Sequence, residues 1–239
     1  MFKPFTLFLS LLIVGSAGAA TWADPEPETL LPSTPAGHFL VHEELWNDLS
    51  DEPGNHLERA RSAFLAIDLK EAADQMRKAA IYLRISSGQA AENSRQALLK
   101  SAHELEELAH RVENGTVKSV HELDSSFARA LHALSHHHWV LAERSWRARQ
   151  NEKAGKQLRA AANTLEQSAA RTGHALQTAT TAVAKETRLV AGKLVEGTGF
   201  VVDEIGKGFA KFGQQVETVG KGIEPAAPAA ARNATAPRK

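Results

Sequence analysis

Apolar and polar positions follow a helical pattern along most of this chain, between two Pro-rich segments near its ends. The residues that dominate this region are Ala, Leu, Glu, Lys, Arg and Gln, which are good helix formers. Runs of β-branched residues, which would favour strands, are few. The pattern therefore predicts an all-α fold.

Helix start and stop signals divide the region into segments. Three capping boxes, each with a polar N-cap residue three positions before a glutamate, mark helix starts at Asn55/Glu58, Asp68/Glu71 and Ser119/Glu122. The sequence DEPG at 51–54 is expected to end a short helix at 38–49, and Asn114-Gly115 predicts another helix end. A last turn near Asn151 precedes a helix expected to run to about Gly220.

Residues 56–86 and 138–168 resemble each other at an offset of 82 residues. Ten of the 31 aligned positions are identical, which favours an internal duplication of a helix–turn–helix hairpin. Two such hairpins in series predict an up-down helical bundle within residues 38–175. Its core is expected to contain Phe64, Met76, Leu83, Trp146, Leu158 and Leu165.

Residues 176–223 are expected to form one long, Gly-rich amphipathic helix. Apolar residues spaced 11 apart form a straight stripe along it: Val190, Val201, Phe212 and Ile223, with Leu194, Ile205 and Val216 beside them. Eight glycines between Gly192 and Gly222 each cost roughly 1 kcal/mol relative to alanine, so this helix should not persist alone. The stripe predicts contact with the protein's own bundle, a second copy, a protein partner or a membrane surface.

The first 23 residues resemble an export signal. Lys3 precedes a short apolar run at 5–14, and small residues suited to cleavage follow up to Ala23. The apolar run is too short for a comfortable membrane span, although an uncleaved anchor is the alternative. Residues 24–37 are a Pro-rich linker and 224–239 a disordered Pro/Ala tail by composition. We expect a periplasmic or secreted protein.

Charge and cysteine content exclude some partners and chemistry. Lys plus Arg and Asp plus Glu each number 28, so the formal net charge is zero and no basic patch for nucleic acid is indicated. The chain contains no Cys. A disulfide or a thiolate metal site is therefore impossible, and any metal must be bound by imidazole and carboxylate groups.

The 11 histidines are the main candidate ligands. His56 and His138 occupy equivalent positions in the two hairpin copies. If the first and third helices of a bundle run parallel, these two imidazoles could face each other and bind a transition metal or haem. No CxxCH motif occurs, so any haem would be bound non-covalently.

Other histidines are spaced for metal binding. His132 and His136, like His38 and His42, are four residues apart and share a helix face, and His137 adjoins the first pair. His110 and His121 flank the Asn114-Gly115 turn, near three glutamates. The sequence therefore predicts transition-metal sites, for Cu, Zn or Ni, at these residues.

No catalytic motif occurs in the sequence. We therefore expect a non-enzymatic, exported helical-bundle protein that acts by self-association, by binding a protein partner or by binding a membrane surface through its C-terminal helix. The alternative hypothesis is a periplasmic protein that binds or sequesters a metal or haem with histidine ligands.

Overall fold

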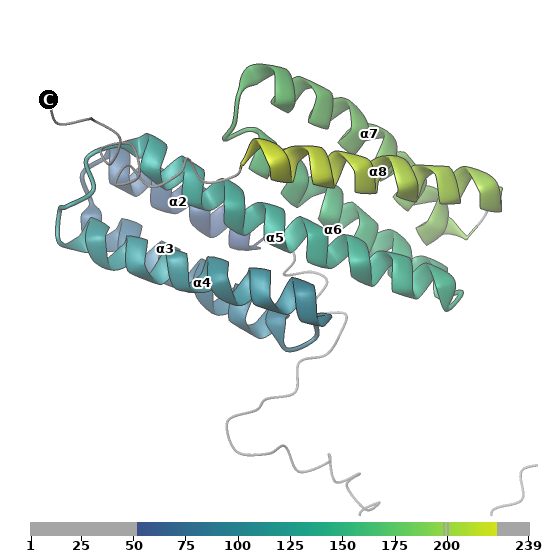
Figure 1. Ribbon diagram of the computed structural model, residues 1–239, viewed down its shortest axis with the longest axis horizontal. Helices are drawn as coiled ribbons and strands as arrows, with labels where there is room; N and C mark the ends of the chain where they lie inside the picture. Colours follow the sequence, from purple (N-terminus) through teal and green to yellow (C-terminus); the bar gives the residue numbers. More distant parts are fainter. Residues whose placement is uncertain (1–51, 198, 200, 224–239) are drawn as a thin grey trace, which may run out of the picture. The chain divides into compact units, whose positions relative to one another are not determined.

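A computed structural model describes residues 52–197, 199 and 201–223. Within these residues the chain forms seven helices and no strand, which confirms the predicted all-α bundle (Figure 1). The helices are α2 (Glu52–Leu65), α3 (Leu69–Ser87), α4 (Glu92–Glu113), α5 (Val120–Arg147), α6 (Asn151–Ala169), α7 (His174–Glu196) and α8 (Val202–Gly222). None of the helices in this described part is long and apolar enough to span a membrane.

Several predicted features lie on residues that the structure does not describe. These are the export signal at 1–23, the linker at 24–37, the tail at 224–239, and the histidine pair His38 and His42. They stay predictions.

Local capping explains where the helices begin and end. The Asp68 carboxylate accepts a hydrogen bond from the Glu71 backbone N–H at 3.1 Å and caps α3. Ser119 caps α5 in the same way, accepting from the His121 N–H at 3.2 Å. Helix α4 ends at Glu113, and Gly115 follows with a φ of +65°. These three predicted signals are confirmed.

The helix start predicted at Asn55 is wrong, whereas the end of the short helix predicted at 38–49 lies outside the described residues. Helix α2 already begins at Glu52, so Pro53 and Gly54 lie in its first turn. Proline fits there because the first N–H groups of a helix have no intrahelical partner. Gly54 is buried beneath Gln167, whose side chain occupies the space that a Cβ would need. The glycine therefore serves close packing against α6 instead of ending a helix.

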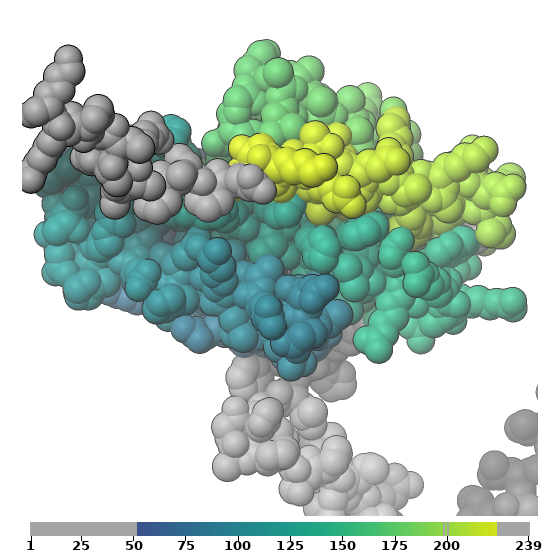
Figure 2. All heavy atoms as spheres, in the orientation of Figure 1, coloured from purple at the N-terminus to yellow at the C-terminus, as the bar shows by residue number. Residues whose placement is uncertain are grey.

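Buried apolar side chains form two clusters that share the long helix α5. The first lies among α2, α3, α4 and the N-terminal half of α5, and the second among α5, α6, α7 and α8. Figure 2 shows the blue and teal atoms of the first group on one side and the green and yellow atoms of α7 and α8 on the other. Each predicted hairpin therefore completes a core with the two helices that follow it. The expectation of one core containing Met76 and Leu158 together is wrong.

The two groups of helices correspond at an offset of 82 residues. Helices α3 and α6, α4 and α7, and α5 and α8 begin at equivalent positions, and α2 and α5 end at equivalent positions. The turns after α2 and α5 also share an unusual backbone: Ile67 has a φ of +64° and Arg149 a φ of +61°. The geometric correspondence extends well beyond the predicted hairpins. Its origin in a sequence duplication stays a prediction.

Three ion pairs between helices also recur at this offset. Arg84–Glu106, at 2.6 Å, is equivalent to Arg188–Glu166, at 2.8 Å, with the two charges exchanged. The pairs Glu104–Arg129 and Arg111–Glu122 are equivalent to Glu186–Lys211 and Glu204–Lys193. The first four-helix unit is thus α2–α5 and the second is α5–α8, with α5 serving as the last helix of one and the first of the other.

The predicted continuous helix at 176–223 is wrong, because it is divided into α7 and α8. The break occurs at Gly197 and Gly199, whose φ angles of +70° and +71° a helix cannot contain. Gly197 is equivalent to Gly115, the residue that follows α4. The two helices then fold back on each other, so the apolar stripe closes the second core.

The glycines of α8 allow it to approach α5 closely. A Cβ at Gly213 would lie 2.6 Å from the Trp139 ring, and one at Gly220 would lie 2.9 Å from the His132 ring. The apolar face of α8, including Phe212 and Val216, is buried. Tertiary packing within the protein therefore offsets the low helix propensity of this segment.

The strained turn after α2 yields a stability prediction. Ile67 is β-branched, is 80% exposed, and has a positive φ that L-residues adopt at a cost of about 1–2 kcal/mol. The variant Ile67→Gly removes this strain, and the greater entropy of the unfolded chain offsets part of the gain, so we expect a net stabilisation of about 0.5–1 kcal/mol. Urea denaturation would measure it. The matched variant Arg149→Gly should gain less, since arginine is not β-branched, and an equal or larger gain would contradict the argument.

Candidate functional site

Four histidines lie in the middle of α5, where this helix passes from the first core to the second. They are His132, His136, His137 and His138. The side chains of His137 and His138 are buried, with exposed fractions of 1% and 4%. Successive residues on a helix point about 100° apart, so the four rings are directed towards different neighbours.

The predicted chelating pair His132 and His136 contacts two different helices. The Nε2 of His132 lies 2.9 Å from the backbone carbonyl of Val216 in α8, and can donate to it. The Nδ1 of His136 lies 3.2 Å from the hydroxyl of Ser94 in α4. Within the described residues, no group of three or more His, Asp or Glu side chains is placed to bind a metal ion. The structure therefore does not assemble the metal site predicted at His132, His136 and His137.

Burial controls the protonation of His137 and His138. Desolvation, with a smaller effect from the neighbouring imidazole, lowers the pKa of His137 to about 4 and that of His138 to about 3. The same desolvation lowers the pKa of His132 and His136. The Nε2 atoms of His137 and His138 are buried without a hydrogen-bond partner in the described part of the chain. At neutral pH the cluster is therefore uncharged.

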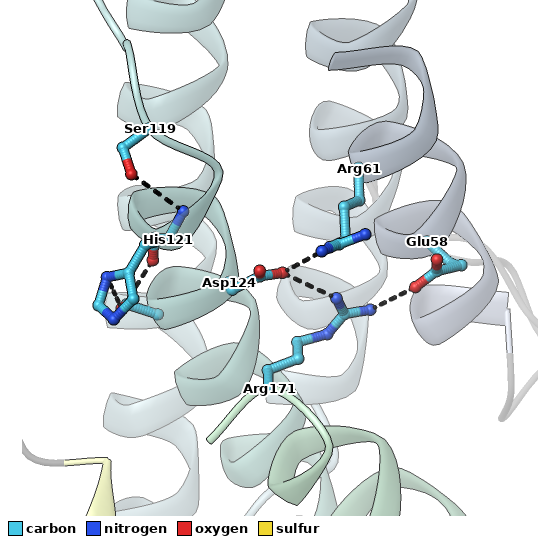
Figure 3. Close-up of polar contacts among 7 residues, drawn as sticks. Glu58, Arg61, Ser119, His121, Asp124 and Arg171 are labelled. Atoms are coloured by element: carbon cyan, nitrogen blue, oxygen red, sulfur yellow. Dashed lines mark hydrogen bonds and ion pairs between the residues drawn. The ribbon is translucent and has the colours of Figure 1, made fainter. Parts of the chain in front are cut away.

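The structure does not place His56 and His138, the predicted pair of haem or metal ligands, opposite each other. Helix α2 runs antiparallel to α5, and Arg61 pairs with Asp124 at 3.0 Å (Figure 3). In that register His138 lies nine residues, about 13 Å, along the α5 axis from the level of His56. The Nδ1 of His56 instead lies 2.6 Å from the Gln75 side-chain oxygen. The prediction failed because the first helix of the second unit is also the last helix of the first.

The carboxylates near His110 and His121 are already paired with arginines. The pairs are Glu106–Arg84, Glu113–Arg77 and Glu122–Arg111. A guanidinium beside each carboxylate competes with any cation for it, and Arg84 lowers the pKa of Glu106. His110 lies within reach of the Asn114 side chain, and His121 lies 3.5 Å from the Ser125 hydroxyl. The predicted carboxylate-assisted metal site is therefore not formed.

A groove of about 1440 Å³ adjoins these histidines. It is bounded by α4, the start of α5, the turn between α6 and α7, and the end of α8. Every glutamate in its lining has a basic partner: Glu104–Arg129, Glu106–Arg84, Glu107–His103 and Glu122–Arg111. Because three of these four carboxylates are paired with arginines, the lining offers no cluster of unpaired acids to a ligand.

A charge network centred on a nearly buried arginine connects the two units. Arg171, in the turn after α6, has a side chain that is only 10% exposed and contacts Asp124 at 3.2 Å and Glu58 at 3.0 Å (Figure 3). Its guanidinium also lies 5.4 Å from the centroid of the Phe127 ring. The three charged residues are far apart in the sequence, and the sequence analysis assigned Glu58 only to a capping box, so sequence reasoning missed the network. The network fixes α6 against α2 and α5, which is a structural role.

Exposed aliphatic side chains occur at both ends of the helical array. Leu65 and Ile67, at the turn after α2, are 56% and 80% exposed. Val201 and Val202, at the start of α8, are each 64% exposed. Of these four positions, the sequence pattern singled out only Val201, as part of the apolar stripe. Arg147 and Arg149 occupy the equivalents of Leu65 and Ile67 and could have indicated the difference at the first end.

Comparison with known proteins gives no further identification. No family model, no curated protein and no solved structure matches the chain.

Proposed function

We propose that this protein is a non-enzymatic interaction protein, exported to the periplasm or secreted, that binds another protein chain through the ends of its helical array. The observation that carries this proposal is the exposure of Leu65 and Ile67 at the turn after α2. Isolated exposed aliphatic residues are normal on a protein surface. Here, however, two of them flank one tip, and one has a strained backbone.

The equivalent turn after α5 shows that the turn itself does not require apolar residues. Arg147 and Arg149 occupy the same positions there, and Arg149 adopts the same positive φ as Ile67. Neither folding nor the local backbone explains why Leu65 and Ile67 should be apolar. Burial by a partner would explain it, since each aliphatic side chain gains about 1.5–3 kcal/mol when it leaves water.

The ends of the array are better candidate surfaces than the C-terminal helix that the sequence indicated. Most of the apolar stripe that motivated binding through this helix is buried against the protein's own helices. Of the stripe, Val201 is strongly exposed, and it lies at the second end beside the exposed Val202. The metal and haem alternative has less support, because the described histidines do not converge on one site.

Site-specific crosslinking in cells that express the full chain would test this proposal. A photoreactive amino acid at position 67 should crosslink to a protein, because a contact surface is buried by its partner. The matched control is position 100, where the lysine side chain is 73% exposed on the middle of α4. Equal crosslinking from both positions, or none from position 67, would overturn the proposal.

A further inference from the structure

The turns after α2 and α5, which lie at opposite ends of the helical array, carry opposite charges. Residues 62–74, around the turn after α2, contain three acids and one lysine, a net charge of −2. Residues 144–156, around the turn after α5, contain five basic residues and one glutamate, a net charge of +4. These two ranges are equivalent at the offset of 82, so the same backbone turn carries a different charge in each unit. The second turn at each end, residues 111–122 and 193–204, adds a net charge of 0 at the first end and −2 at the second.

Each end also combines its charge with a pair of exposed aliphatic residues. At the first end these are Leu65 and Ile67, on the turn itself. At the second end they are Val201 and Val202, at the start of α8. The start of α6 packs against the end of α7, since a Cβ at Gly155 would touch α7, and this places the start of α8 beside the second turn.

The two ends cannot contact each other within one molecule. The first end lies at the start of α5, where Leu69 approaches Gly115, and the second lies at the C-terminus of α5. Helix α5 has 28 residues and is therefore about 42 Å long. Figure 1 shows the turn after α2 and the turn after α5 at opposite ends of the array. The acidic end of one molecule can therefore contact only the basic end of another copy.

We propose that the acidic end of one copy docks on the basic end of the next, so that this protein associates head to tail. This inference rests on the proposed function and names its partner as a second copy of the chain. Opposite charges provide orientation and register, and the aliphatic pairs provide apolar area. Because the two surfaces differ, the contact is heterologous and produces open chains of copies instead of a closed two-fold dimer.

Sedimentation velocity of the full chain would test head-to-tail association. The average mass should rise with protein concentration over the micromolar range. It should fall when salt is raised from 0.05 M to 0.5 M, because salt screens exposed charges.

Charge reversal at each end distinguishes direct docking from other modes of association. Glu71→Lys with Asp74→Lys gives residues 62–74 a net charge of +2 and introduces the residues found at the equivalent positions, Lys153 and Lys156. Arg147→Glu, Arg149→Glu and Lys153→Glu give residues 144–156 a net charge of −2. Each set alone should weaken association at least tenfold, since like charges then meet. Both sets combined in one chain should restore it, whereas the control Lys100→Glu should leave it unchanged.

The outcomes separate this inference from the proposed function. Head-to-tail docking is wrong if the wild-type chain associates but neither set of substitutions weakens the association. It is also wrong if the combined variant is folded by circular dichroism but does not associate again. In both cases the chain still binds a second copy of itself, as the proposed function allows. If the wild-type chain stays monomeric throughout, the inference is also wrong. A crosslink from position 67 to a different protein would then still support the proposed function.

Discussion

Lowering the pH from 7 to 5 should reduce the free energy of unfolding by about 4 kcal/mol through His137 and His138 alone. Burial holds the pKa of these two groups at about 4 and about 3, below the value of 6.5 that they have when unfolded. The unfolded chain therefore binds more protons than the folded chain between these values. This stability is present above pH 6.5 and is lost as the pH falls towards the folded pKa, at about 2 kcal/mol per histidine by pH 5.

The surroundings of the cluster determine the sign of this effect. The neighbouring titratable groups on α5 are themselves imidazoles, and the identified partners from α4 and α8 are the Ser94 hydroxyl and the Val216 carbonyl. Among the described residues, no carboxylate forms an ion pair with any of the four histidines. A proton on His137 or His138 thus has no nearby acid in an ion pair to stabilise it.

The double variant His137→Phe, His138→Phe tests this origin directly. Urea denaturation at several pH values should show that the variant loses much less stability between pH 7 and pH 5 than the wild-type chain. A smaller loss should persist, because burial also lowers the pKa of His132 and His136. Parallel pH profiles for the two proteins would show that the buried pair does not cause the acid sensitivity.

Local signals allowed several helix boundaries to be predicted from the sequence. The Asp68 cap, the Ser119 cap and the Gly115 stop each depend on residues within one turn of the chain. The similarity at an offset of 82 residues could also be recognised in the sequence, but only within 56–86 and 138–168, where identical residues occur. Beyond residue 168 it is preserved mainly by geometry and by ion pairs, one of which, Arg84–Glu106, recurs as Glu166–Arg188 with its charges reversed.

The candidate metal sites could not be predicted because ligand convergence depends on tertiary structure. Spacing places His132 and His136 on one helix face, yet neighbouring helices direct their nitrogens to different partners. The pairing of His56 with His138 assumed two separate parallel helices. Since α5 belongs to both units, that geometry does not exist. Nothing in the sequence pattern indicates that a helix is shared.

The role of the glycines in the structure differs from the role that the sequence indicated. The glycines of the C-terminal region indicated a helix of low intrinsic stability. In the structure, some of them end helices and others, such as Gly213, admit a large side chain of a neighbouring helix. The composition records the number of glycines, but only the packing shows which are required.

Gly155, in α6, should be the glycine most sensitive to substitution by alanine. We expect Gly155→Ala to destabilise the protein by about 2 kcal/mol. A Cβ there would lie 2.6 Å from the Ala191 carbonyl oxygen, 2.8 Å from the Val195 side chain and 3.0 Å from Leu194. The nearest of these atoms is backbone, so α6 and α7 must move apart. That overpacking costs typically 1–3 kcal/mol or more and outweighs the gain of about 1 kcal/mol in helix propensity.

Gly192 provides the matched control within the same pair of helices. It also lies inside a helix, α7, but nothing lies within 4 Å of the position that its Cβ would occupy. Gly192→Ala should therefore stabilise the protein by about 1 kcal/mol, so the two substitutions should shift the urea midpoint in opposite directions. The first unit has Ala73, fully buried, at the position equivalent to Gly155. An increase in stability for Gly155→Ala as well would therefore mean that α6 and α7 can adopt the spacing of α3 and α4, and that the close approach of the second unit is not a requirement of its fold.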